Sequence, residues 1–140
     1  MHRFTIRVRY GDTDQMGFAY YGNYLRWFEI GRAEMMRSLG RSYRDIESQG
    51  IWLPVLEASC RYLKPARYDD EVVIETGVRD LGRASVRFGY RIVRADDGEL
   101  LAHGETEHCY MAPGGRPVRP PAELLELLSA APAALPATGA

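Results

Sequence analysis

The sequence has few cysteines, almost no net charge and no long apolar run, and each absence excludes a class of protein. Two cysteines, Cys60 and Cys109, are too few for a disulfide framework, and they lack the close spacing of a zinc site. A formal net charge of −1 does not indicate nucleic acid or an anionic membrane as a bulk partner. No apolar run approaches the roughly 20 residues that span a bilayer, and residues 1–7 lack an apolar signal core. We therefore expect a cytoplasmic protein without stable membrane insertion.

Strand patterns dominate the chain, and one long helix interrupts them. Alternating apolar and polar residues predict a first strand over 4–10. Apolar residues at helical spacing predict a helix over 24–39, which Gly40 ends. Within that helix Gly31 lowers the intrinsic helicity, which is best tolerated where another element approaches closely. Further strands are predicted at 53–63, 71–78, 84–94 and 100–111, and a last short helix at 123–128. Apolar and polar residues alternate cleanly over 84–94, and Asp97-Gly98 predicts a tight hairpin turn before the next strand.

This order of elements predicts the fold class. Consecutive antiparallel strands with one long helix are typical of an α+β domain in which the helix covers one face of the sheet. We place this single domain at residues 1–128. The Ala- and Pro-rich residues 129–140 are predicted to be disordered. Because open sheet edges invite pairing with another chain, we expect a homo-oligomer.

Two carboxylates, Asp12 and Asp14, lie two residues apart in the loop before the long helix. Loops held on a rigid scaffold are where catalytic groups concentrate. The start of the following helix presents unpaired amide hydrogens and a partial positive charge, which can polarise a carbonyl oxygen. An Asp just upstream can attack the carbonyl carbon or activate a water toward it. The combination suits the hydrolysis of an ester or a thioester.

The same residues also fit a structural role. Asp commonly shapes turns and caps helices, and spacing alone favours that role for Asp12 and Asp14. Asn23 is the best helix N-cap by composition. A metal site at the Asp pair has less support, because no His or further acidic cluster lies nearby.

A signature block covers this loop and the start of the helix. It consists of Arg9-Tyr10-Gly11-Asp12-Thr13-Asp14, then Gly17, Tyr20, Tyr24, Phe28-Glu29 and Arg32. With weaker similarity over 62–70 and 81–85, the block resembles the 4-hydroxybenzoyl-CoA thioesterase family. The resemblance covers about residues 5–111 and implies a hotdog fold, in which an antiparallel sheet wraps the long helix. It also implies a homodimer or homotetramer with active sites at the subunit interface, and no metal or redox cofactor.

The resemblance also assigns roles to individual residues. It implies that Asp14 is the catalytic carboxylate and that a backbone amide at the helix start, at Tyr21, holds the thioester carbonyl. Many bacterial relatives carry His at the position of Tyr21, so the preferred substrate stays open. Among substrate-contacting positions, the resemblance and the loop's composition indicate Gly17 and Tyr20, and for the CoA phosphates Arg83 and Ser85.

Other charged and aromatic residues leave alternatives open. Arg61, Lys64 and Arg67 form a second basic cluster, which is either an exposed face or a phosphate clamp. Some hotdog enzymes use a helix carboxylate, but in this family's motif Glu29 looks structural. Among the aromatic residues we assign Tyr24 and Phe28 to the core, and Tyr20 or Tyr21 to an acyl pocket.

We therefore predict an acyl-CoA thioesterase that releases free acid and CoA, with Asp14 as nucleophile or general base. A hotdog dehydratase or hydratase is a second hypothesis, but its chemistry usually pairs a His with an acid. His103 and His108 lie late in the chain, away from any such motif. A non-catalytic acyl-CoA-binding module is the third hypothesis. No DNA-binding helix pair or basic extension indicates a transcriptional regulator.

Overall fold

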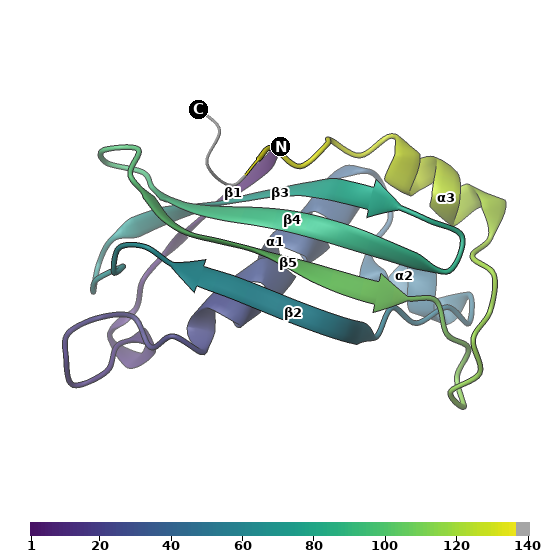
Figure 1. The fold of residues 1–140 in the computed structure, drawn as a ribbon, viewed down its shortest axis with the longest axis horizontal. Helices are drawn as coiled ribbons and strands as arrows, with labels where there is room; N and C mark the ends of the chain where they lie inside the picture. Colours follow the sequence, from purple (N-terminus) through teal and green to yellow (C-terminus); the bar gives the residue numbers. More distant parts are fainter. Residues whose placement is uncertain (137–140) are drawn as a thin grey trace.

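The computed structural model describes residues 1–136, which form one antiparallel sheet, three α-helices and one short 3-10 helix (Figure 1). The elements are β1 (His2–Arg7), η1 (Tyr10–Asp12), α1 (Asn23–Ser38), α2 (Tyr43–Ser48), β2 (Val55–Tyr62), β3 (Glu71–Leu81), β4 (Ser85–Arg94), β5 (Leu100–Cys109) and α3 (Ala122–Ser129). The predicted α+β class is thus confirmed. The first strand begins at His2 and ends at Arg7, earlier than the predicted range 4–10, and the chain enters η1 from Tyr10.

The five strands are ordered β1-β3-β4-β5-β2, and every neighbouring pair is antiparallel. The two strands at the edges, β1 and β2, flank the helix α1 along the chain, and the three inner strands follow as consecutive hairpins. The turn between β4 and β5 contains Asp97 and Gly98, as predicted, with Gly98 at φ +73°, but it spans residues 95–99 and is longer than the predicted tight turn. The sheet therefore leaves β2 as an open edge beside the start of α1.

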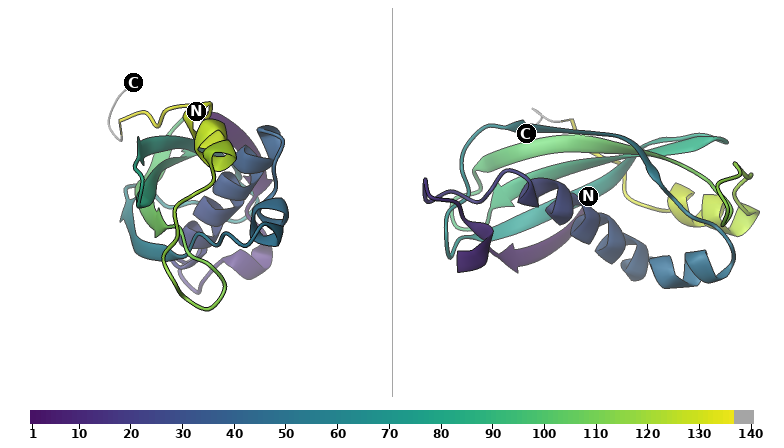
Figure 2. Two further views of the ribbon diagram at one scale, coloured as in Figure 1. Left: turned by 90° about the vertical axis from the view of Figure 1, so that its right-hand side faces the viewer. Right: turned by 90° about the horizontal axis from the view of Figure 1, so that it is seen from below.

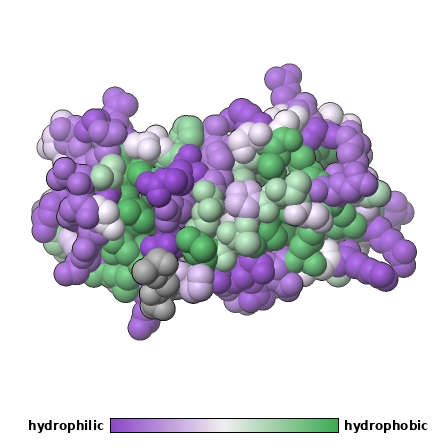
Figure 3. Space-filling model, turned by 90° about the horizontal axis from the view of Figure 1, so that it is seen from above, coloured by the Kyte–Doolittle hydropathy of each residue, from purple (hydrophilic) through white to green (hydrophobic). Residues whose placement is uncertain are grey.

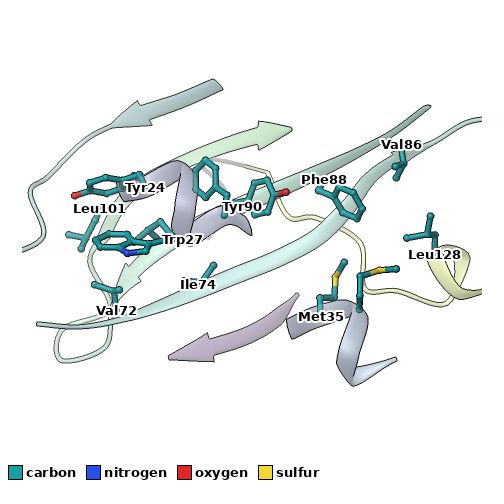
Figure 4. Close-up of a cluster of buried hydrophobic side chains, with 14 of the residues drawn as sticks. Tyr24, Trp27, Met35, Val72, Ile74, Val86, Phe88, Tyr90, Leu101 and Leu128 are labelled. Atoms are coloured by element: carbon teal, nitrogen blue, oxygen red, sulfur yellow. The ribbon is translucent and has the colours of Figure 1, made fainter. Parts of the chain in front are cut away.

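Helix α1 lies across one face of the sheet and buries its apolar side there (Figure 2). Tyr24, Trp27 and Met35 of α1 face Ile74 and Tyr90 of the sheet in one cluster (Figure 4). The predicted core positions of Tyr24 and Phe28 are confirmed, because these side chains are 3% and 0% exposed. Burial of this side, more than intrinsic propensity, stabilises the helix.

Gly31 is the point of closest approach between α1 and β3. A Cβ atom on Gly31 would lie 2.4 Å from Oγ1 of Thr76 and 2.5 Å from Cγ2 of Ile74. The predicted close approach at this glycine is confirmed. The tight packing of α1 on β3 that Gly31 allows offsets the helix propensity lost by having glycine there.

Helix α2 was not predicted, although its start carries a recognisable signal. The side chain of Ser42 accepts a hydrogen bond from the amide of Asp45, and the side chain of Asp45 accepts one from the amide of Ser42. This reciprocal pair is a capping box with Asp at its third position. The helix has six residues, too few to show an apolar period.

The C-terminal segment differs from the disordered tail that composition predicted. The amide of Val78 donates to the carbonyl of Pro132, and the amide of Ala134 donates to the carbonyl of Val78. The segment thus extends the sheet along β3, beyond the end of β1. The segment has almost no large side chains, but its backbone is ordered by hydrogen bonds to β3. Composition alone does not predict such bonds, because β3 is distant in the sequence. Residues 137–140 of the predicted tail lie outside the described residues.

The outer surface is mixed in polarity. The face seen in Figure 3 carries apolar areas near the α3 end and at the opposite end, with hydrophilic groups between them. None of the helices within residues 1–136 combines the length and apolar composition needed to cross a bilayer. At the open edge, Val55 and Leu56 of β2 are 51% and 59% exposed.

Candidate active site

A cleft of about 260 Å³ opens where the loop between β1 and α1 meets the end of β2. Its walls come from three stretches of the chain: the loop, the first turn of α1, and the residues at and after the end of β2. The lining residues are Asp14, Met16, Phe18, Ala19, Tyr21, Tyr24, Tyr62, Leu63, Lys64 and Pro65. The cleft is largely apolar, and Asp14 is its one carboxylate. An apolar pocket with a single acidic group is typical of a site for chemistry on an apolar substrate.

Local backbone geometry fixes the carboxylate of Asp14. Its Oδ1 accepts hydrogen bonds from the amides of Met16 at 2.9 Å and Phe18 at 3.4 Å. The backbone amide of Asp14 donates to the carbonyl of Phe18, and Gly17 closes the turn at φ +81°. Gly17 thus shapes the loop, since few other residues adopt this conformation. Within residues 1–136 no hydrogen bond engages Oδ2 of Asp14, which leaves that oxygen available for chemistry.

Asp12 serves the fold instead. Its Oδ2 accepts from the amide of Arg9, and its Oδ1 pairs with the guanidinium of Arg26 at 2.9 Å. Its carbonyl accepts hydrogen bonds from the side chain of Asn23 and the amide of Tyr20. Both oxygens of the Asp12 carboxylate are therefore engaged, in contrast to those of Asp14. The structural role that spacing alone favoured for the pair applies to Asp12.

The start of α1 presents the backbone donors of the site. Gly22 is the N-cap and Asn23 the first helical residue, so the predicted cap at Asn23 is wrong by one position. The side chain of Asn23 donates to the carbonyl of Asp12 instead of capping the helix. Within the described residues the amide of Tyr21 donates no hydrogen bond, while the carbonyl of Tyr20 in the same peptide accepts one from Asn23. A peptide polarised in this way is a better donor through its free N–H group.

Aromatic rings form one wall of the cleft. The ring of Tyr62 packs edge-on against Tyr24 and Tyr21, with centroids 4.9 and 6.4 Å away. Its hydroxyl donates to the carbonyl of Tyr21 at 2.9 Å, and burial raises the pKa of that hydroxyl. The ring of Tyr20 packs on that of Tyr21 at a tilt of 44°, with centroids 4.7 Å apart, outside the cleft lining. Of the two tyrosines predicted for the acyl pocket, Tyr21 thus lines the cleft.

The sequence did not single out Tyr62, Leu63 or Met16 as site residues. Tyr62 and Leu63 begin the second block of family resemblance, and that position was the available signal. Tyr62 lies 41 residues after Tyr21 in the chain. It approaches the first block only because β2 pairs with β5 at the edge of the sheet. Met16 carries no sequence signal beyond its place in the loop.

The structure does not bring Arg83 and Ser85 near Asp14 in the same chain. β3 begins beside Arg7, near the loop, and runs 11 residues to the turn that carries Arg83. The loop and this turn lie at opposite ends of the sheet (Figures 1 and 2). Arg83 lines a separate pocket with Arg119 and the first part of α3. A shared substrate would therefore need Arg83 and Ser85 from a second copy of the chain.

The three side chains of the basic cluster around Pro65 have different surroundings. Lys64 lines the cleft and lies 3.9 Å from a carboxylate oxygen of Glu99. The guanidinium of Arg67 lies over the ring of Phe18 at 4.9 Å from its centroid. Arg61 lines a different groove. The cluster is neither one clamp nor one uniform solvent-exposed face.

The histidines and cysteines do not add a catalytic pair to the cleft. His108 is fully buried, and its ring bonds the carbonyl of Leu53 and the hydroxyl of Thr106. His103 lines the groove that contains Arg61. Burial raises the pKa of the Cys60 thiol to about 11, which disfavours the reactive thiolate. Among residues 1–136, no group of three or more His, Cys, Asp or Glu side chains could hold a metal ion.

Comparison with known proteins gives a consistent result. The model of the thioesterase superfamily matches residues 16–101. YneP of Bacillus subtilis is 38% identical over 103 residues, which are 74% of each chain. YbgC of Escherichia coli O6:H1, an acyl-CoA thioester hydrolase, is 32% identical over 69% of this chain and 72% of its own.

A solved structure extends the comparison to the fold. The DHNA-CoA thioesterase of Staphylococcus aureus superimposes with a TM-score of 0.80 at 36% sequence identity. The superposition covers 84% of this chain and 78% of that chain.

Proposed function

Because this chain belongs to the thioesterase superfamily and is a thioester hydrolase, we propose that it cleaves an acyl- or aryl-CoA to the free acid and CoA in the cleft beside Asp14. Its antiparallel sheet and helices match the hotdog-fold thioesterases, and we interpret α1 as the central helix of that fold. The cytoplasmic location and the narrower 4-hydroxybenzoyl-CoA family remain predictions.

One observation carries the proposal: among residues 1–136 the cleft contains a single carboxylate, and one of its oxygens accepts no hydrogen bond from these residues. The turn amides hold Oδ1 of Asp14 and thereby aim Oδ2. We propose two routes between which the geometry does not choose. In one, Oδ2 attacks the thioester carbon, the thiolate of CoA leaves, and water hydrolyses the resulting anhydride. In the other, Asp14 takes a proton from a water that attacks the same carbon.

The free amide of Tyr21 is the proposed donor to the carbonyl oxygen of the substrate. Negative charge develops on this oxygen as the thioester carbon becomes tetrahedral. An N–H group that is already fixed and polarised stabilises that charge without reorganising. The helix start adds a partial positive potential at the same place. The aromatic wall and Leu63 then accommodate the acyl or aryl group.

We further propose that the working unit is a homodimer or homotetramer. The β2 edge has unpaired backbone groups and exposes Val55 and Leu56, features that favour pairing with another chain. In this proposal a second copy brings its Arg83 and Ser85 to a CoA bound beside Asp14, which the same residues of the first chain do not approach.

The test is thiol release from a panel of aliphatic and aromatic acyl-CoA thioesters. Asp14→Asn should bind acyl-CoA and release thiol about 100-fold more slowly or worse. The substitution is mild for the fold, because the amide oxygen of Asn can still accept from Met16 and Phe18. Glu29→Gln on the exposed side of α1 is the matched control and should hydrolyse at the wild-type rate. Near-normal turnover by Asp14→Asn, with native circular dichroism, would refute the assignment.

A further inference from the structure

A second groove, of about 460 Å³, lies at the β2 side of the sheet and shares no lining residue with the cleft. Strands β2, β5 and β3 supply its walls. The lining residues are Ser59, Cys60, Arg61, Arg79, His103, Gly104 and Glu105. The proposed hydrolysis at Asp14 uses none of them.

A row of charged residues crosses the whole sheet and ends in this groove. Directly paired residues of neighbouring strands point to the same face. The register therefore aligns, from β1 to β2 on one face, Arg3, Glu75, Arg91, His103 and Arg61. Only one of these five side chains is acidic.

The carboxylate of the row, Glu75, and the carboxylate that lines the groove, Glu105, are already engaged. Glu75 pairs with Arg3 at 2.5 Å and with Arg91 at 3.6 Å. The single carboxylate of Glu105 forms ion pairs with both Arg79, at 2.7 Å, and Arg87, at 3.5 Å. Within residues 1–136, Arg61 has no ion pair. The β2 end of the row therefore has more cationic groups than carboxylates.

The cations of this groove act on His103. Arg61 and His103 stand directly opposite each other, so the field of the guanidinium opposes a positive charge on the imidazole. Burial, followed by the fields of Arg61, Arg79 and Arg91, lowers the pKa of His103. A bound anion would offset these fields and favour the protonated imidazole.

We propose that this groove binds a phosphate group, held by the guanidiniums of Arg61 and Arg79, the hydroxyl of Ser59 and the imidazole of His103. Guanidinium forks match phosphate oxygens with paired, charge-assisted hydrogen bonds. Arg79 is held in place, because its guanidinium donates to the carbonyl of Leu135 and pairs with Glu105. The groove thus combines a fixed cation with a more exposed one, Arg61.

Two sources of phosphate fit this chemistry. One is the nucleotide end of the thioester substrate, which would pass around the open β2 edge, because the neighbouring residues Arg61 and Tyr62 point to opposite faces of the sheet. This source rests on the proposed function. The other is a separate nucleotide or free phosphate, which does not. Both require the same phosphate-binding groups.

Direct binding tests the groove independently of hydrolysis. Pyrophosphate and adenosine 3′,5′-bisphosphate are titrated into the full-length protein by calorimetry. Wild type should bind, and Arg61→Gln should bind about tenfold more weakly, the loss of one charge-assisted contact. Arg116→Gln, in an exposed loop, is the matched control and should bind as wild type does. By NMR the pKa of His103 should rise when pyrophosphate saturates the protein.

Kinetics then separate the two sources. If the phosphate belongs to CoA, Arg61→Gln should raise KM for acyl-CoA about tenfold and leave kcat near the wild-type value. The same acyl group on N-acetylcysteamine, which has no phosphate, should be hydrolysed equally by both proteins. Unchanged KM for acyl-CoA with weakened pyrophosphate binding assigns the groove to a separate phosphate ligand. Absence of binding to wild type in the millimolar range, or equal binding by Arg61→Gln, overturns the proposal.

Discussion

The hydroxyl of Tyr62 donates a hydrogen bond of 2.9 Å to the carbonyl oxygen of Tyr21 and so ties the end of β2 to the start of α1. The same carbonyl accepts from the amide of Tyr24 at 3.2 Å. The backbone on the C-terminal side of Tyr21 is thereby fixed by two donors. Since the amide of Tyr21 is the proposed contact to the thioester oxygen, Tyr62 is a positioning residue for that contact.

Removing this hydroxyl should affect turnover more than binding. In Tyr62→Phe the ring can keep its packing on Tyr24, but the hydrogen bond is lost. We expect kcat to fall about threefold to tenfold with little change in KM, which corresponds to about 1 kcal/mol. The matched control is Tyr68→Phe, at an exposed tyrosine that does not line the cleft. Steady-state kinetics with one acyl-CoA decide; an increase in KM alone would contradict the positioning role.

The approach of α1 to β3 predicts a stability effect. Gly31→Ala places a methyl group within 2.5 Å of Thr76 and Ile74, so the helix must shift away from the sheet. We expect the free energy of unfolding to fall by about 1–3 kcal/mol, although Ala is the better helix former. Urea unfolding measures the change. Gly11→Ala, where a Cβ meets no atom within 4 Å, is the control. Equal or greater stability of Gly31→Ala would contradict the close contact.

His108 predicts a dependence of stability on pH. Its Nδ1 faces the carbonyl of Leu53, which only accepts, so Nδ1 donates and Nε2 accepts from the hydroxyl of Thr106. The hydroxyl of Tyr90 then donates to Thr106, and Arg32 donates to Tyr90. This chain of hydrogen bonds requires a neutral imidazole. Burial, reinforced by Arg32, lowers the pKa of His108 to about 4.

The unfolded chain binds this proton more readily, with a pKa near 6.5. The stabilisation is therefore complete above about pH 6.5 and is lost as the pH falls toward 4. We expect a loss of at most about 3 kcal/mol over that window. His108→Gln, which cannot titrate, should lack this part of the slope in urea unfolding measured at several pH values. Parallel profiles for the two proteins would show that His108 is not the responsible group.

A mixing experiment tests whether two subunits share each site. Asp14→Asn and Arg83→Ala are each expected to hydrolyse acyl-CoA poorly at substrate concentrations below KM. If Asp14 of one copy works with Arg83 of another, a mixed dimer contains one intact site. Refolding the two variants together should then restore about a quarter of the wild-type rate, given random pairing of equal amounts. Without restoration, Arg83 does not act on the partner's site.

Local patterns in the sequence predicted much of this fold. The period of α1, the alternation along β4 and the position of the turn at Asp97-Gly98 are short-range signals, and all three were confirmed. The helix α2 and the C-terminal segment were missed for different reasons. Six residues show no period, and the segment at Pro132 to Ala134 is ordered by backbone partners on β3.

The site was predictable only in part. Sequence placed two carboxylates before a helix, but their difference depends on partners such as Arg26, which pairs with Asp12 alone. Tyr62 joins the site through strand pairing, which no local pattern reports. Arg83 is far from the loop because β3 runs 11 residues between them. Whether Arg83 meets a site on a second copy depends on how chains assemble, which one chain's sequence does not specify.

The central claim is that the free carboxylate oxygen of Asp14 performs or drives the attack on the thioester carbon. Single-turnover hydrolysis of one acyl-CoA by excess Asp14→Asn tests it most directly, because this measurement isolates the chemical step from product release. We predict a rate at least about 100-fold below that of wild type, with unchanged affinity for the substrate. A single-turnover rate within about threefold of wild type would contradict the account.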